Sequence, residues 1–288
     1  MQPQWQGLGK VQFSKWQGLG NNYIVLHVEQ LPFELTPERV RLLCDRNLGI
    51  GSDGILLIGE KTAEARFPLR IFNPDGSEAE KSGNGLRIFA RALWDQQRVA
   101  LLPFTVETLG GPVSCTVAPG GHSVTVAMGR VSFRSTDIPV GGPDREVLNE
   151  EIAVADRTFI FCAATVGNPH CVVFSPSPSA QEARLYGPLI ETEPRFPKRT
   201  NVQFMRVIDR QNIQIEIWER GAGYTLASGS SSTAAAAVAR RLGFCDDRIC
   251  VRMPGGQIEL RFDENFAATM SGSVTRVAEG KMAEEMFL

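Results

Sequence analysis

The chain lacks the composition biases that would indicate a membrane, secreted or nucleic-acid-binding protein. No apolar run approaches the ~20 residues of a membrane span, and the opening MQPQWQGLGK has no signal-peptide pattern. Lys and Arg number 30 against 32 Asp and Glu, so the net charge of −2 offers no electrostatic footprint for nucleic acid or an anionic membrane. We therefore expect a cytoplasmic protein whose partner is a small molecule.

Histidine and paired cysteines are also scarce. The three histidines lie far apart in sequence, and the six cysteines include no C-x-x-C, so we expect no metal site and buried, reduced thiols. Residues 49–54 satisfy G-x-G-x-x-G, but they follow a predicted helix and precede a strand, which is the reverse of a dinucleotide-binding loop. They predict a tight turn. Motifs of P-loop proteins and α/β-hydrolases are missing.

An internal repeat dominates what is present. With 288 residues and 43% apolar residues, the chain can bury two cores of ordinary size. Four landmarks recur at offsets between 143 and 147 residues: the pairs Gly110-Gly111 and Gly255-Gly256, the closing Gly129 and Gly272, the pairs Ser82-Gly83 and Ser228-Gly229, and the pairs Gly20-Asn21 and Gly167-Asn168. We interpret them as two copies of one fold related by a pseudo-twofold axis.

Local patterns predict the same elements in each copy. Thr36 and Pro37 predict a helix start by N-capping and by proline at the first helical position. Helices are also expected after Ser82 and after Ser228, the latter containing four consecutive alanines and stopping at Gly243. Strands and hairpin turns fill the remainder. The predicted fold class is α+β, with two α/β-roll domains, each an antiparallel sheet wrapped around a central helix.

The two Ser-Gly junctions are the strongest candidate site. Serine before a helix is an ordinary N-cap, which is the simpler interpretation of each junction alone. As a matched pair facing an inter-domain cleft, the two helix starts would offer N–H groups and positive dipole ends to a carboxylate. Polar residues in neighbouring Gly- or Pro-marked loops support an amino-acid site: Asn73, Asn84, Asn168, His170, Asn201, Glu219 and Arg220.

These segments resemble the diaminopimelate epimerase family, whose members interconvert LL- and meso-diaminopimelate in lysine biosynthesis without pyridoxal phosphate. The resemblance rests on FSKWQGLGNNYIV, GIGSDGILL, NPDGSEAEKSGNGLRIFA, GNPHCVVF, FPKRTNVQF and ERGAGYTLASGSSSTAAAA. It covers nearly the whole chain. It implies two roll domains with the active site between them, no cofactor, and a C-terminal segment that returns to the first domain. The expected boundaries are 1–129 plus 275–288 for one domain and 130–274 for the other.

The resemblance also implies roles for individual residues. Asn73, Asn201 and Arg220 would hold the distal end of the substrate, with further polar contacts from Asn21 and Asn168. The α-carboxylate would bind the backbone amides of Gly83, Asn84, Gly229 and Ser230. A homodimer is compatible with this reading.

The sequence departs from the family at the two proton-transfer positions, where Ser82 and Ser228 replace cysteines. A serine hydroxyl is far less acidic than a thiol and needs a neighbouring base. Three interpretations stay open: an epimerase, of diaminopimelate or another amino acid, with His170, Glu219 or Asp75 as base; a non-catalytic amino-acid-binding paralogue; and an engineered Cys-to-Ser variant. The altered flank SGSSST disfavours the third.

Overall fold

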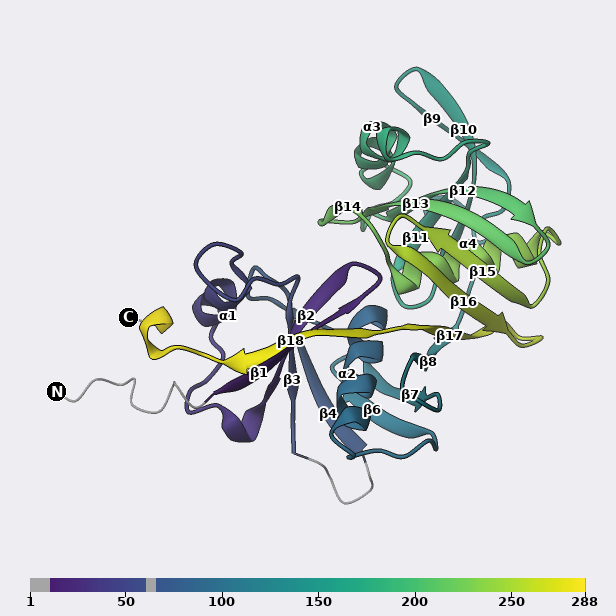
Figure 1. Ribbon diagram of the computed structural model, residues 1–288. Coiled ribbons are helices and arrows are strands. Elements are labelled where there is room, and N and C mark those ends of the chain that lie inside the picture. The colour runs from purple at the N-terminus through teal and green to yellow at the C-terminus, as the bar shows by residue number, and fades with distance from the viewer. Residues whose placement is uncertain (1–10, 61–65, 288) are drawn as a thin grey trace. The chain divides into compact units, whose positions relative to one another are not determined.

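The computed structural model describes residues 11–60 and 66–287, and the chain divides into two compact units. The N-terminal unit runs to Val126 and resumes at Gly272, while the C-terminal unit comprises Ala127–Ser271. The sequence-based boundaries at 129 and 274 lie a few residues later. Each unit consists of a sheet with helices packed against it (Figure 1).

In the described residues of the N-terminal unit, two helices connect neighbouring strands of one sheet. Its strands are β1 (Gln12–Gly18), β2 (Asn21–His27), β3 (Ile55–Ile58), β4 (Arg66–Phe72), β5 (Glu78–Ala79), β6 (Phe104–Thr108), β7 (Gly111–Val117), β8 (Ser123–Arg130) and β18 (Thr275–Lys281). Its helices are α1 (Pro37–Cys44) and α2 (Gly83–Asp95), with short 3-10 turns at Val28–Gln30 and Glu284–Phe287. Pairing of β18 with β1 brings the C-terminal segment into this unit.

The C-terminal unit repeats this plan. Its strands are β9 (Glu150–Val154), β10 (Arg157–Thr165), β11 (Pro169–Phe174), β12 (Asn201–Asp209), β13 (Asn212–Glu219), β14 (Gly223–Thr225), β15 (Arg248–Met253), β16 (Gly256–Phe262) and β17 (Ala267–Ser273). Its helices are α3 (Ala180–Glu191) and α4 (Gly229–Arg241). Strands β8 and β17 each extend past a unit boundary.

Strand pairing confirms the duplication and corrects one detail. In the N-terminal unit β1–β2 is antiparallel, β2–β3 parallel, β3–β4 antiparallel, β4–β6 parallel and β6–β7 antiparallel. The series β10–β11, β11–β12, β12–β13, β13–β15 and β15–β16 alternates identically. The sheets are therefore mixed, not wholly antiparallel as expected, because α1, α2, α3 and α4 each cross over between two neighbouring strands.

The central helices are α2 and α4. Helix α4 is buried on nearly every side from Ser231 to Ala239 and contacts strands β10 to β13, β15 and β16. Its alanines permit this, since a methyl side chain lets strands approach the helix closely. Helix α2 similarly contacts β1, β2, β3 and β7. Capping follows the sequence patterns: Thr36 accepts a hydrogen bond from the Arg39 amide, and Gly243 adopts a φ of 76° just past α4.

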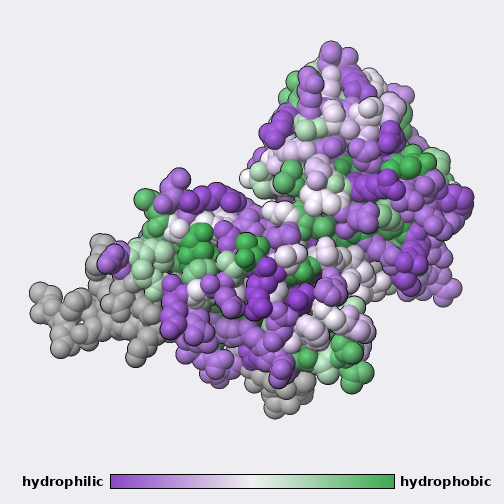
Figure 2. Space-filling model, viewed as in Figure 1, coloured by the Kyte–Doolittle hydropathy of each residue, from purple (hydrophilic) through white to green (hydrophobic). Residues whose placement is uncertain are grey.

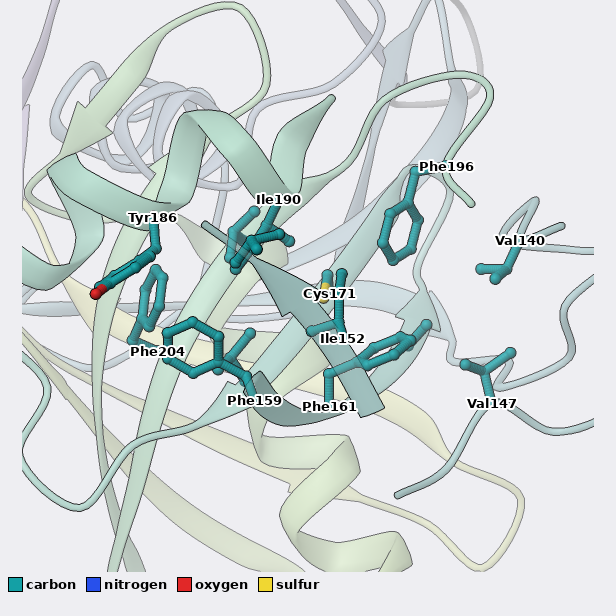
Figure 3. Close-up of a cluster of buried hydrophobic side chains, with 14 of the residues drawn as sticks. Val140, Val147, Ile152, Phe159, Phe161, Cys171, Tyr186, Ile190, Phe196 and Phe204 are labelled. Atoms are coloured by element: carbon teal, nitrogen blue, oxygen red, sulfur yellow. The ribbon is translucent and has the colours of Figure 1, made fainter. Parts of the chain in front are cut away.

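The other helix of the C-terminal unit, α3, covers an aromatic core. Tyr186 and Ile190 reach from α3 toward Phe159 and Phe204 (Figure 3). The Phe159 ring lies edge-on to Tyr186 and to Phe204, with centroids 5.1 and 5.9 Å apart. Hydrophilic residues cover most of the visible face of this unit (Figure 2). In the described part of the chain, no helix is long and apolar enough to cross a membrane.

Candidate active site

Ser82 and Ser228 cap the two central helices with the same geometry. Ser82 has φ −142° and ψ 118°, and Ser228 has φ −146° and ψ 126°. The Ser82 Oγ accepts a hydrogen bond from the Gly85 amide at 3.0 Å, and the Ser228 Oγ accepts one from the Ser231 amide at 3.4 Å. Both serines are therefore N-caps, as expected for each junction alone, and the duplication places them at equivalent positions in the two units.

The first turns of α2 and α4 carry no acidic residue, whereas α1 has Glu38 and α3 has Glu182 there. An acidic side chain in the first turn offsets the positive end of the helix dipole. Without one, the first amides of α2 and α4 remain an attractive place for an anion. The amides concerned are those that the family resemblance implies for the α-carboxylate: Gly83, Asn84, Gly229 and Ser230. We call the region around Ser82 half-site 1 and the region around Ser228 half-site 2.

In half-site 1 an amide chain ties α2 to strand β2. Asn84 Nδ2 donates to Asn21 Oδ1 at 3.2 Å, and Asn21 Nδ2 donates to Asp53 Oδ2 at 3.3 Å. The same Asp53 oxygen accepts from the Asn22 backbone and side chain, both at 2.8 Å. Asn21 and Asn84 are thus brought together, and Asp53, which the sequence reasoning passed over, orients the pair.

A buried guanidinium supports the same chain from inside the helix. Arg87 is 0% exposed and donates to Asn84 Oδ1 at 2.9 Å. Burial lowers its pKa to about 10, so Arg87 still carries a positive charge near neutral pH. A fixed cation one turn into α2 adds to the attraction for an anion at the helix start. Nothing in the sequence pattern distinguished Arg87 from an ordinary surface arginine.

Tyr23 touches Ser82 directly. Alternation along β2 puts Asn21, Tyr23 and Val25 on one face, and the Tyr23 hydroxyl lies 3.1 Å from Ser82 Oγ. The ring of Tyr23 rests against Gly54, where a Cβ would stand only 2.7 Å from Tyr23 Cε1 and 2.5 Å from the Phe72 carbonyl oxygen. Gly54, the last glycine of the G-x-G-x-x-G stretch, directly precedes β3 and leaves space for this phenol.

Asn73 and Asp75 lie in the turn after β4. Asn73 Nδ2 donates to Ser77 Oγ at 2.9 Å, and Asp75 accepts from the Ser77 backbone and hydroxyl at 2.9 and 2.6 Å. These hydrogen bonds from Ser77 lower the pKa of the exposed Asp75 carboxyl. Asp75 is thus an ionised, weakly basic turn residue, while the half-buried Asn73 lies directly at the strand end.

In half-site 2 a buried network orients Asn168. His170 is 0% exposed, with Nε2 2.9 Å from Asn168 Oδ1 and Nδ1 3.1 Å from Gln203 Nε2. Gln203 Nε2 also donates to Ser231 Oγ at 3.0 Å, in the first turn of α4. Burial, with a smaller effect from Arg220, lowers the pKa of His170 to about 3. The imidazole is therefore neutral, and both ring nitrogens are engaged within the protein.

Glu219 approaches Ser228. Burial raises the pKa of the Glu219 carboxyl above its ordinary value, while the nearby hydroxyls of Ser228 and Thr225 act in the opposite direction. A carboxyl whose pKa is raised by burial is a stronger base than an exposed one. Ser228 itself is 5% exposed and stands 3.5 Å from Ser230, Oγ to Oγ. Glu219 therefore lies near the start of α4, close to the hydroxyls of Ser228 and Thr225.

The loop that carries Arg220 is held by two buried side chains. Asn201 Oδ1 accepts from the Arg220 amide at 3.0 Å, and Asn201 Nδ2 donates to the Pro169 carbonyl at 2.9 Å. Glu191 accepts from the Gly221 amide at 2.9 Å. The Arg220 side chain is exposed and donates to the Lys198 carbonyl. Asn201 and Arg220 therefore come together, and Glu191 is a further residue that the sequence pattern missed.

Three buried cysteines have thiol pKa values raised strongly by burial. Burial raises the pKa of Cys115 to about 12 and of Cys162 to about 11, and it raises the pKa of Cys171 well above its ordinary value. A thiol with so high a pKa is protonated and inert near neutrality.

Comparison with known proteins connects this arrangement to one family. The family profile described as diaminopimelate epimerase matches residues 13–134 and 162–277. "Diaminopimelate epimerase 2" of Nostoc sp. is 56% identical over 277 residues, covering 96% of this chain and 97% of that protein. "Diaminopimelate epimerase 1" of the same organism is 36% identical over 281 residues, covering 94% and 99%.

A solved structure shares the fold at low identity. A hydroxyproline epimerase from Agrobacterium vitis, crystallised with trans-4-hydroxy-L-proline, has a TM-score of 0.66 at 16% identity and covers 94% of this chain and 90% of its own. A PhzF-family protein from Bacillus anthracis also gives 0.66, at 14% identity, covering 95% and 99%. Both have the two-domain architecture described above.

Proposed function

The chain belongs to the diaminopimelate epimerase family of isomerases, and we propose that it inverts the α-carbon of an amino acid, with Ser82 and Ser228 as the two proton-transfer residues. The observation that carries the proposal is the matched capping geometry of Ser82 and Ser228, each at a helix start without a first-turn acid. Two equivalent hydroxyls at two anion-binding helix starts suit a reaction in which one removes and the other returns the α-proton.

Diaminopimelate is the first candidate substrate. The amides of Gly83, Asn84, Gly229 and Ser230 would bind its α-carboxylate, and Asn21 and Asn168 would add polar contacts. Asn73, Asn201 and Arg220 would hold the distal amino-acid group. The Arg220 cation would bind its carboxylate, and the neutral amides of the asparagines would bind its ammonium group. The guanidinium of Arg220 is exposed and donates to the Lys198 backbone carbonyl, which leaves its positive charge available for this.

Glu219 is the proposed base. Its carboxylate would take the Ser228 proton as the Ser228 oxygen takes the α-proton from the substrate. His170 is better suited to fix Asn168 through Nε2 than to accept a proton, because both nitrogens are occupied and its pKa is near 3. Asp75 is committed to Ser77 and is a weak base.

A second candidate is supported by the Nostoc paralogues. This chain is 56% identical to epimerase 2 but 36% identical to epimerase 1 of one organism. An organism with two paralogues can assign them different tasks, so epimerisation of another amino acid, or binding of one without turnover, is the alternative. The low-acidity serines favour the binding alternative, while Glu219 beside Ser228 favours catalysis.

The experiment is α-hydrogen exchange in deuterated water across a panel of amino acids that includes LL- and meso-diaminopimelate, with calorimetry on the same panel. Wild-type exchange of one amino acid supports the epimerase. Exchange by the Ser82→Cys/Ser228→Cys variant alone, together with binding by wild type, identifies the non-catalytic paralogue. If neither the wild type nor the variant exchanges or binds any amino acid of the panel, both candidates are contradicted.

The wider setting follows from the same proposal. A small amino acid, and neither nucleic acid nor a membrane, is the expected partner, and the cytoplasm is the expected location. No cofactor takes part in the proposed steps. A homodimer would sediment with twice the 31.6 kDa mass of one chain, which analytical ultracentrifugation measures.

A further inference from the structure

The two half-sites differ in the side chain that accompanies each serine. In half-site 2 the ionisable group near Ser228 is the carboxyl of Glu219, a base. In half-site 1 the companion of Ser82 is the phenol of Tyr23, an acid, 3.1 Å from Oγ. The two helix starts therefore have nearly the same backbone geometry, but one lies near a base and the other near an acid. The sequence repeat does not reveal this difference.

The hydrogen bonds around Ser82 prepare its hydroxyl to donate. The oxygen of a hydroxyl accepts two hydrogen bonds and donates one. Ser82 Oγ accepts from the Gly85 amide at 3.0 Å, and the Tyr23 hydroxyl lies 3.1 Å away, where either oxygen can donate. When Tyr23 donates, it fills the second acceptor position of Ser82. The Ser82 proton is then left to point away from both partners. Because Ser82 is only half-buried, that proton can reach a bound ligand.

Strand pairing and close packing fix the position of the Tyr23 phenol. Tyr23 is 7% exposed and pairs with Trp16 across β1 and β2. A side chain at Gly54 would collide with its ring. Tyr23 and His170 both stand two residues after the asparagine of a Gly-Asn pair, so they occupy equivalent positions in the two units. Yet His170 bonds to Asn168 and Gln203, whereas Tyr23 bonds to the helix-capping serine.

We propose that Tyr23 supplies the proton that Ser82 delivers to the substrate, an assignment that rests on the epimerase function proposed above. The α-C–H bond breaks as its proton passes to Ser228 and the Ser228 proton passes to Glu219. A C–H bond then forms on the opposite face with the Ser82 proton, and the Tyr23 O–H proton replaces it. Afterwards Glu219 releases a proton to water and the tyrosinate takes one from water, so no proton is gained or lost.

The test is a double-mutant cycle between Tyr23→Phe and Ser82→Cys. Phenylalanine keeps the ring against Gly54 and removes only the hydroxyl. With serine at 82, Tyr23→Phe should lower kcat by about 10²-fold, the lower range for a general acid, and change KM less than twofold. When Ser82→Cys is also present, the same change should cost less than about threefold, because a thiol of ordinary pKa near 8.5 supplies its own proton.

Tyr186→Phe is the matched control, since it removes a tyrosine hydroxyl with a hydrogen bond of the same 3.1 Å length, to Asp156. It should leave kcat unchanged. An equal loss of kcat from Tyr23→Phe in both backgrounds would overturn the proposed proton relay. It would show that Tyr23 only positions residue 82. Unchanged kcat in an active wild-type background would overturn it as well. Lack of exchange by wild type would instead refute the proposed turnover.

Discussion

His170 provides a quantitative test of the network in half-site 2. An unfolded histidine has a pKa near 6.5, whereas the buried imidazole has a pKa of about 3. Below pH 6.5 the unfolded chain binds a proton that the folded chain refuses. The stability contributed by His170 is therefore complete above pH 6.5 and is lost progressively as pH falls toward 3.

The size of this effect follows from the two pKa values. Between pH 8 and pH 5, selective protonation of the unfolded state lowers the free energy of unfolding by about 2 kcal/mol, and the full interval down to pH 3 corresponds to about 5 kcal/mol. The assay is urea denaturation at a series of pH values for wild type and His170→Gln. The pH dependence of the variant should be shallower by about 2 kcal/mol over pH 5 to 8.

His122→Gln is the control, because it removes an exposed histidine from the other unit, and its stability should follow the wild-type pH dependence. The imidazole C2 proton of His170 in wild type gives a second readout, and its NMR shift should stay constant from pH 8 to 5. Parallel stability curves for wild type and His170→Gln, or a titrating C2 resonance, would refute the neutral, positioning role of this residue.

Three further changes test other parts of the structure. Asp53→Asn should weaken amino-acid binding about tenfold by calorimetry, because Asn21 and Asn22 lose a charged acceptor, whereas Asp45→Asn, which removes a turn carboxylate, should not; equal binding by both would contradict the role of Asp53. Gly54→Ala should lower the free energy of unfolding by more than about 2 kcal/mol through its steric clash, and clearly more than Gly129→Ala, where a Cβ meets nothing within 4 Å; equal losses would exclude the clash as the cause. If Glu219 is the base, the exchange rate should fall as pH decreases through its pKa, which burial sets above 4.5, and Glu219→Gln should lack this limb; an unchanged profile would eliminate Glu219.

Much of the architecture could be predicted because it depends on local patterns. Thr36 and Pro37 start a helix, Gly243 ends one, and the recurring Gly-Asn and Ser-Gly pairs reveal the duplication. The parallel strand pairs were missed because strand direction depends on how crossover helices return the chain, and a hairpin-rich sequence suggests antiparallel neighbours.

The site divides in the same way. Ser82, Ser228 and the asparagines stand in glycine-marked loops that the sequence makes visible. Tyr23, Asp53, Arg87 and Gln203 act through contacts across 28 to 59 positions, or through burial, and neither can be read from one sequence. Asp53 lies inside the stretch GIGSDG, whose glycine spacing predicts a turn and gives no sign of a role for the carboxylate.

The most direct measurement of the central claim compares α-deuterium incorporation by wild type with that by Ser82→Ala and Ser228→Ala, each purified from a host without an epimerase of its own. Alanine keeps the backbone and removes one hydroxyl at a time. We predict deuterium uptake by wild type and at least a hundredfold slower uptake by each variant. Uptake at the wild-type rate by either alanine variant would contradict a reaction carried by two serines.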